Sequence, residues 1–166
     1  MAELTAIESK IGEVLGLAMA AQGATEKVTK LVEEEGGHDD LVAALEQMHR
    51  EAREAEERTT ELAGNLDGKK TAILEKARET KQEATEMMST YLGDDADALD
   101  GFEFLTMAEA GEVGHWSVVG TMNQRARVDG LQELVDWMKP IQQRHFEQTL
   151  AGSVELAADE DPNEPA

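Results

Sequence analysis

The sequence predicts an all-α protein with five helices. Ala, Glu, Leu, Met, Gln and Lys, which all favour helices or tolerate them well, dominate the 166-residue chain, and runs of β-branched residues are absent. Only 3 prolines occur. Apolar residues recur every three or four positions in five segments, which is the spacing of one buried face of a helix. The length permits one domain with a substantial core.

The first two helices are predicted to form a hairpin. The first helix begins near Thr5, because Thr5 and Glu8 have the spacing of a capping box. A pair of glycines ends it, and Asp39 or Asp40 can cap the second helix, which continues to a glycine-containing break at 64–68. The predicted core positions of these two helices are Ile7, Ile11, Val14, Ala18, Ala21, Val28 and Val32, then Leu41, Leu45, Met48, Ala52, Ala55, Thr59 and Leu62.

Three more helices follow. The third is expected over 69–92 and carries many Lys and Glu residues on its outer face. The fourth is expected over 101–125 with Asp100 as its N-cap, and the fifth begins after Asp129 as N-cap. The breaks between them contain glycine, aspartate or asparagine, which are typical of helix ends and turns.

The third helix decides the predicted topology. About 23 helical residues at 1.5 Å each span roughly 35 Å, which is enough to return the chain along the whole bundle. The second and fourth helices then run in the same direction, and the core consists of two hairpins joined by a long crossover helix. Residues 1–157 form a single helical-bundle domain in this interpretation, and 158–166 form an acidic disordered tail.

Charge and composition exclude several classes of function. The formal net charge of -21 repels nucleic acid and anionic lipid, so neither a nucleic acid nor a membrane is expected as a partner. The chain has no cysteine, which excludes disulfides, thiolate metal sites and thiol catalysis. Neither a signal peptide nor a membrane-spanning apolar run is recognisable, so the cytoplasm is the expected location.

Polar residues occupy predicted core positions in the last two helices. Glu109, Glu112 and His115 follow one another at intervals of three in the fourth helix, among apolar residues that predict a buried face. Gln142 and His145 have the same interval in the fifth helix. Burial of unpaired carboxylates is costly, so either a hydrogen-bond network or a metal ion must compensate for it. Carboxylates and imidazoles on facing helices commonly bind iron, manganese or zinc.

These motifs resemble the ferritin-like superfamily, and especially its small bacterial members with an extra crossover helix. The likeness covers mainly residues 102–150, in the stretches from Met107 to Trp116 and from Pro140 to Phe146. The resemblance implies a four-helix bundle with a di-iron or related metal centre, usually with one Glu and one Glu-x-x-His in each hairpin. The chain departs from that pattern where Gln142 and Gln22 replace expected glutamates. In the second helix, the Glu-x-x-His motif has only approximate counterparts at 46–49 and 54–57.

The leading hypothesis is a ferritin-like metal-binding protein, with iron the first candidate and zinc or manganese next. Its function would lie in metal handling or the response to oxidative stress; whether it is an enzyme is left open. The predicted ligands are Glu112, His115 and His145, with Glu109, Gln142 and Glu56 in supporting positions. The alternative is a non-catalytic bundle that acts as a scaffold or interaction protein after its metal site has decayed. A homo-oligomer fits either interpretation, and small-molecule binding beside Ala52 and Ala55 is a third hypothesis.

Overall fold

The protein is all-helical. The computed structural model describes residues 2–164, which contain five helices and no strand. The helices are α1 (Ala6–Glu35), α2 (Asp39–Gly64), α3 (Lys70–Tyr91), α4 (Ala98–Ala126) and α5 (Leu131–Asp159). The predicted all-α class and the number of helices are confirmed.

The helix starts show where local sequence signals suffice and where they mislead. At the start of α1 the Glu8 backbone N–H donates to the Thr5 hydroxyl, and the Thr5 backbone N–H donates to the Glu8 carboxylate, so the predicted capping box is confirmed. The predicted N-cap of α4 is wrong, because Asp97 caps the helix and Asp100 completes the capping box from its third position. The N-caps of α2 and α5 are His38 and Gly130, and neither donates or accepts a side-chain cap hydrogen bond.

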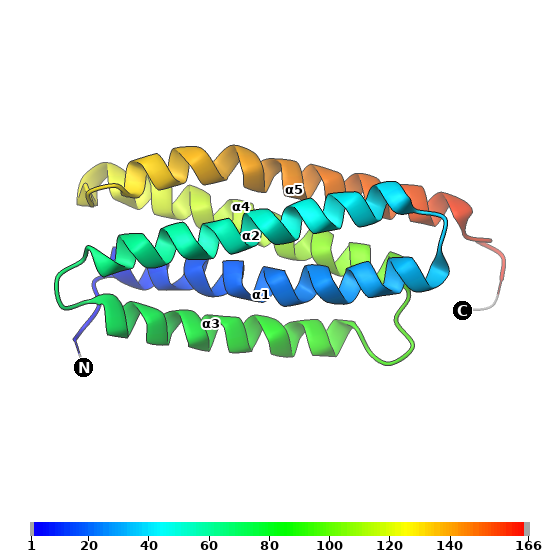
Figure 1. Ribbon diagram of the computed structural model, residues 1–166, viewed down its shortest axis with the longest axis horizontal. Helices are drawn as coiled ribbons and strands as arrows, with labels where there is room; N and C mark the ends of the chain where they lie inside the picture. Colours follow the sequence, from blue (N-terminus) through cyan, green and yellow to red (C-terminus); the bar gives the residue numbers. More distant parts are fainter. Residues whose placement is uncertain (1, 165–166) are drawn as a thin grey trace.

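The helices pack around α1 (Figure 1). Helix α1 contacts α2 on one side, α4 on another and α3 on a third, while α5 packs mainly against α4 and also against α2. Helices α2 and α4 run in one direction, and α1, α3 and α5 run in the opposite direction. Helix α3 lies on the outside of this group and contacts α1 far more than it contacts α2 or α4.

Glycine permits the close approach of α3 to α1. A Cβ atom placed on Gly12 would lie 2.8 Å from Cβ of Lys76, and one on Gly16 would lie closer still to the Ala77 carbonyl oxygen. Such separations are too short for ordinary contacts, so a larger residue at either position would push the two helices apart. These glycines therefore set the distance between α1 and α3.

The core is divided into two apolar clusters along the length of the molecule. One contains Ile11, Leu15, Trp116 and other apolar side chains from α1 to α5, and the second contains Val28, Leu45 and Phe102 with their neighbours. Between the two clusters the apolar pattern is interrupted at the same level in several helices, and buried polar residues take its place. The candidate site lies in this interruption.

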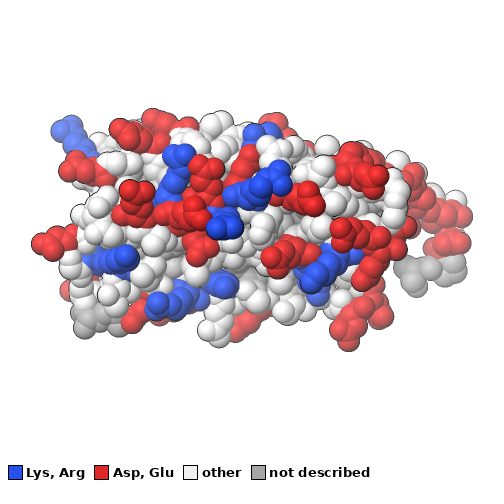
Figure 2. Space-filling view, viewed as in Figure 1, with Lys and Arg blue, Asp and Glu red and all other residues white. Residues whose placement is uncertain are grey.

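The outer surface is strongly acidic (Figure 2). The chain has 36 acidic and 15 basic side chains, and carboxylates are spread over most of the face shown, with Lys and Arg between them. No helix within residues 2–164 has the length and apolarity needed to cross a membrane. The predicted tail overlaps the last two residues of α5, since α5 continues to Asp159; residues 165 and 166 lie outside the described part of the chain.

Candidate functional site

A polar layer lies between the two apolar clusters. We use this name for Glu51 of α2, Glu109 and Glu112 of α4, and Gln142 and His145 of α5. The four residues from α4 and α5 are each between 1% and 6% exposed. Helix α1 contributes no carboxylate; its buried Thr25 hydroxyl borders the layer and donates to the backbone carbonyl oxygen of Ala21.

Glu109 joins α4 to α5 at the centre of the layer. Its carboxylate oxygen Oε2 accepts a hydrogen bond from the side-chain amide of Gln142. The same oxygen lies 3.6 Å from Nδ1 of His145. Gln142 and His145 are three residues apart and therefore share one face of α5, which is why a single carboxylate on the facing helix can reach both.

Glu51 holds His145 from the opposite side. Its Oε2 atom lies 2.5 Å from Nε2 of His145, and the same oxygen accepts a hydrogen bond of 2.5 Å from Nη2 of Arg144. Gln47 donates a third hydrogen bond, 2.9 Å long, to the other carboxylate oxygen. Sequence reasoning missed Glu51 as a site residue, although its position beside the small Ala52 leaves room for α5 to approach.

The charges of this layer are coupled. Burial alone would lower the pKa of His145, but its contacts with Glu109 and Glu51 outweigh burial and raise that pKa above the ordinary value. Burial alone would raise the pKa of Glu51, and its hydrogen bonds with His145, Gln47 and Arg144 reverse this and lower it. A protonated imidazole ring between two carboxylates accounts for both directions.

Glu112 is in a different situation. No hydrogen bond or ion pair joins its carboxyl group to any residue of the described chain, and it is almost completely buried. Burial raises its pKa well above the ordinary value, and the neighbouring charge of Glu109 raises it further. Glu112 borders a small cavity inside the polar layer and also a larger cavity on the other side of α4.

His115 and Glu56 lie outside the polar layer, contrary to their predicted place in it. The side chain of His115 is 38% exposed, and its Nδ1 atom lies 3.5 Å from Oε2 of Glu13 on α1. Glu56 accepts a hydrogen bond of 2.5 Å from the side-chain amide of Gln22 and borders a shallow surface hollow. Helix geometry explains both errors. Because each residue turns the helix by about 100°, the side chain of His115 points about 120° away from that of Glu109 around the α4 axis, and that of Glu56 points about 140° away from that of Glu51 around the α2 axis.

The small cavity has features that suit a cation. Its volume is about 10 Å³, and Glu109, Glu112, Gln142 and His145 are among the residues that line it. The Oε1 atom of Gln142 is buried and accepts no hydrogen bond. Two ligands that bind one ion at about 2.1 Å lie roughly 3.0–3.6 Å apart, so the 3.6 Å between Glu109 Oε2 and His145 Nδ1 fits coordination better than it fits a hydrogen bond.

The polar layer brings its metal-binding atoms together in pairs. Within residues 2–164, the three side chains that place donor atoms within 4.8 Å of one another are His38, Asp40 and Glu155, which form a cluster at the surface. A complete set of ligands in the polar layer therefore requires the carboxylate of Glu112 to turn from the larger cavity into the smaller one. The donor types and the unpaired amide oxygen fit a cation, and Glu109 with His145 provides the closest pair.

Comparisons with known proteins add no assignment: no protein-family model, no curated protein and no solved structure matches this chain. The chemistry of the polar layer is therefore the best guide to the function. That layer can bind a small cation, or it can act as a salt-bridged network that fixes α2, α4 and α5 in register.

Proposed function

We propose that this chain is a ferritin-like bundle whose polar layer binds one metal ion, with iron the first candidate and zinc or manganese next. The observation that supports this most directly is the small cavity, which is lined by two buried carboxyl-bearing residues, an imidazole and a glutamine whose amide oxygen accepts no hydrogen bond. A surplus of buried acceptors needs a positive charge or a donor to compensate for it.

The arrangement of helices supports the ferritin-like interpretation. The α1–α2 and α4–α5 pairs are antiparallel neighbours, and α3 connects them along the outside of α1. Inward carboxylates and an imidazole from facing helices are the way in which four-helix bundles build metal sites. The first hairpin has Gln22 near the middle of α1, turned to Glu56, so the incomplete half of the ferritin-like pattern stays incomplete.

The residues have separate roles in this proposal. Glu109 and His145 hold the ion, with Glu112 and Gln142 completing the oxygen ligands. Glu51 accepts from the other nitrogen of His145 and is itself held by Arg144, which orients the imidazole ring in the way that outer hydrogen-bond partners of metal ligands do. A bound ion would act as a Lewis acid, and a redox-active one such as iron would also permit electron transfer.

A second function is favoured by one specific observation. Both ring nitrogens of His145 already face carboxylates, and the raised pKa favours a protonated ring, which binds no metal. In that case the polar layer is a structural network, and the protein is a non-catalytic scaffold that acts through its surface.

Metal analysis distinguishes the two functions. Protein purified without chelator, and then dialysed against Fe(II), Zn(II) or Mn(II), is expected to retain about one ion per chain by elemental analysis. His145→Ala is expected to lose it, whereas His115→Ala, a matched histidine change outside the polar layer, is expected to retain it. Failure of the wild-type protein to retain any of the three metals would overturn the metal proposal and leave the scaffold.

A further inference from the structure

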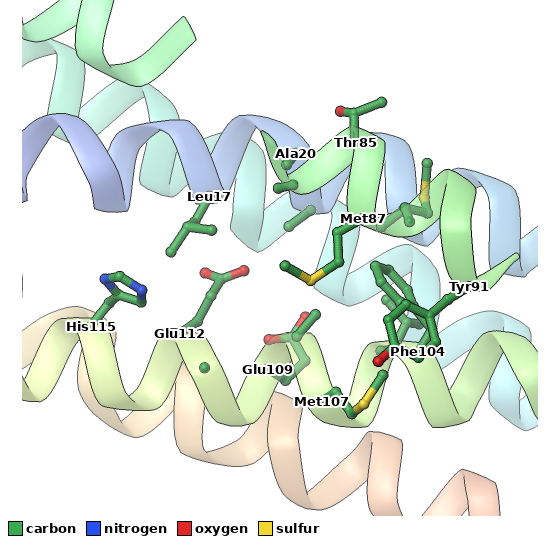
Figure 3. A pocket seen from close by; sticks show the side chains of 17 residues that line it. Leu17, Ala20, Thr85, Met87, Tyr91, Phe104, Met107, Glu109, Glu112 and His115 are labelled. Carbon is green, nitrogen blue, oxygen red and sulfur yellow. The ribbon is translucent and has the colours of Figure 1, made fainter. Parts of the chain in front are cut away.

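A second and larger cavity lies on the other side of α4, between α1, α3 and α4 (Figure 3). Its volume is about 240 Å³, which is slightly below the ~300–1,000 Å³ typical of drug-sized ligand sites. Most of its wall is apolar and includes Leu17 of α1, Met87 and Tyr91 of α3, and Phe104 of α4. The size and lining fit a small ligand with an apolar body.

Small residues keep this cavity open. Helix α3 packs closely on α1 but makes little contact with α4. The facing positions are occupied by Ala20, Ala84, Ala108 and Gly111, so no side chain fills the space that the weak α3–α4 packing leaves. A Cβ atom on Gly111 would meet nothing within 4 Å. The cavity is therefore a consequence of the sequence at these positions, and a larger side chain at Gly111 can be tested without a predicted clash.

The polar groups of the cavity are concentrated at one part of its wall. Figure 3 shows the carboxyl groups of Glu112 and Glu109 rising from α4 into the space below α1. Glu112 is 6% exposed and has no partner within residues 2–164, so its carboxyl group is available to a ligand. His115 stands beside it but faces Glu13. No Lys or Arg lines the cavity.

The mouth of the cavity is apolar and adaptable. Met87, Tyr91 and Met107 are each between 48% and 58% exposed, and all three line the cavity. Methionine has an unbranched, flexible side chain that can adjust to different apolar shapes. Tyr91 and Phe104 lie with their ring centroids 6.1 Å apart at this side of the cavity.

We infer that this cavity binds a small amphiphilic amine, with its apolar tail among the methionines and aromatic rings and its nitrogen against Glu112. An amine fits because its N–H groups can donate to the carboxyl oxygens of Glu112, which accept no hydrogen bond from any residue within 2–164. A carboxylate ligand would meet Glu109 and Glu112 without a positive side chain to balance it, and the net charge of -21 concentrates cations near the protein. The inference concerns the metal-free protein, because Glu112 cannot contact an amine in this cavity and a metal ion in the small cavity at the same time.

Three ligands of matched length test the choice of head group. We would titrate hexylamine, hexanol and hexanoate into chelator-treated protein at 150 mM NaCl by isothermal titration calorimetry. Hexylamine is expected to bind saturably at one site, at least tenfold more tightly than hexanol, with hexanoate weaker still. Equal affinity for the amine and the alcohol, or an amine signal that does not saturate, would overturn the inference.

Two glycine variants test the location. Gly111→Met is expected to weaken hexylamine binding at least tenfold by filling the cavity. Gly114→Met on the same helix, where a Cβ atom also meets nothing within 4 Å and which does not line the cavity, is expected to bind as the wild type does. Glu112→Gln is expected to remove the preference for hexylamine over hexanol. Unchanged amine binding in Gly111→Met would place the ligand elsewhere and contradict the proposal. Metal content measured on that same variant is expected to match the wild type, which separates this test from that of the metal site.

Discussion

At the scale of single residues, His145 is the most informative group in the molecule. It contacts Glu51 on α2 through one nitrogen and Glu109 on α4 through the other, so one imidazole ring links three helices. Removal of one partner from such a buried cluster leaves charges without compensation, which costs more than the contact itself contributes. The stability of the metal-free protein should therefore depend on the protonation of this ring.

The raised pKa of His145 gives this dependence a direction. Below about pH 6.5, the ordinary pKa of histidine, the ring is protonated in both folded and unfolded states and the ion pairs contribute fully. As the pH rises through the raised pKa of the folded state, the proton and its contribution are lost. We expect His145→Gln to lower the free energy of unfolding by about 2–3 kcal/mol at pH 6 and by less than half of that at pH 9. Urea unfolding with chelator present measures this, and an equal loss at both pH values would contradict it.

Burial of the four predicted polar positions Glu109, Glu112, Gln142 and His145 could be inferred from the sequence, because each lies on the apolar face of a helix. The errors at His115 and Glu56 arose from the angle by which successive residues turn around the helix axis. A step of three residues falls 60° short of a full turn, so a third member of such a series leaves the face that the first two share. Glu51 was missed because its role depends on Arg144 and His145, 93 and 94 residues later, and the sequence of α2 alone contains no sign of them.

At the scale of helices, the contact between α1 and α3 depends on two glycines inside α1. A glycine in a helix interior costs about 1 kcal/mol relative to alanine, so its presence needs a compensating benefit. At Gly16 the benefit is the close approach of the α3 backbone at Ala77. Gly23 lies in the same helix and has no neighbour in the direction of a Cβ atom, so it lacks that benefit.

Gly16 and Gly23 form a matched pair for mutation. Gly16→Ala is expected to destabilise the protein by about 1–3 kcal/mol, because the overpacking at α3 exceeds the gain in helix propensity. Gly23→Ala is expected to stabilise it by about 0.5–1 kcal/mol, since only the propensity changes. Thermal or urea unfolding of the two variants provides the comparison. Stabilisation by both variants would show that α3 does not depend on close approach at Gly16.

Helix starts were harder to predict than the helices themselves. Asp97 and Asp100 are both suitable N-caps, and they form one capping box with each other, so the sequence permits a start at either residue. The structure uses the earlier one, and the backbone N–H of Ala98 also donates to the carboxylate of Glu35 at the end of α1. That contact joins residues 63 positions apart, and a local pattern cannot reveal it.

At the scale of the whole molecule, the position of the polar layer follows from polar residues of α2, α4 and α5 that lie at one level of the bundle. The polar positions of α4 and α5 are visible in the sequence and Glu51 of α2 is not, and the alignment of all three helices depends on helix lengths and directions. The crossover length of the third helix was enough to predict that α2 and α4 run in the same direction, which the structure has. The larger cavity was not predictable, because it arises from the weak contact between α3 and α4.

The excess of carboxylates predicts how the whole molecule responds to salt. With 36 acidic and 15 basic side chains, the compact folded state concentrates negative charge that the unfolded chain spreads out. Screening by salt weakens this repulsion, so the free energy of unfolding at pH 8 is expected to rise by about 1 kcal/mol between 20 mM and 500 mM NaCl. Near pH 4.5, where many carboxyl groups are protonated, the same salt change is expected to have a much smaller effect. Urea midpoints at the four conditions measure this. A midpoint at pH 8 that falls with salt would mean that attractive pairs such as Arg144 with Glu51 outweigh the repulsion across the acidic surface.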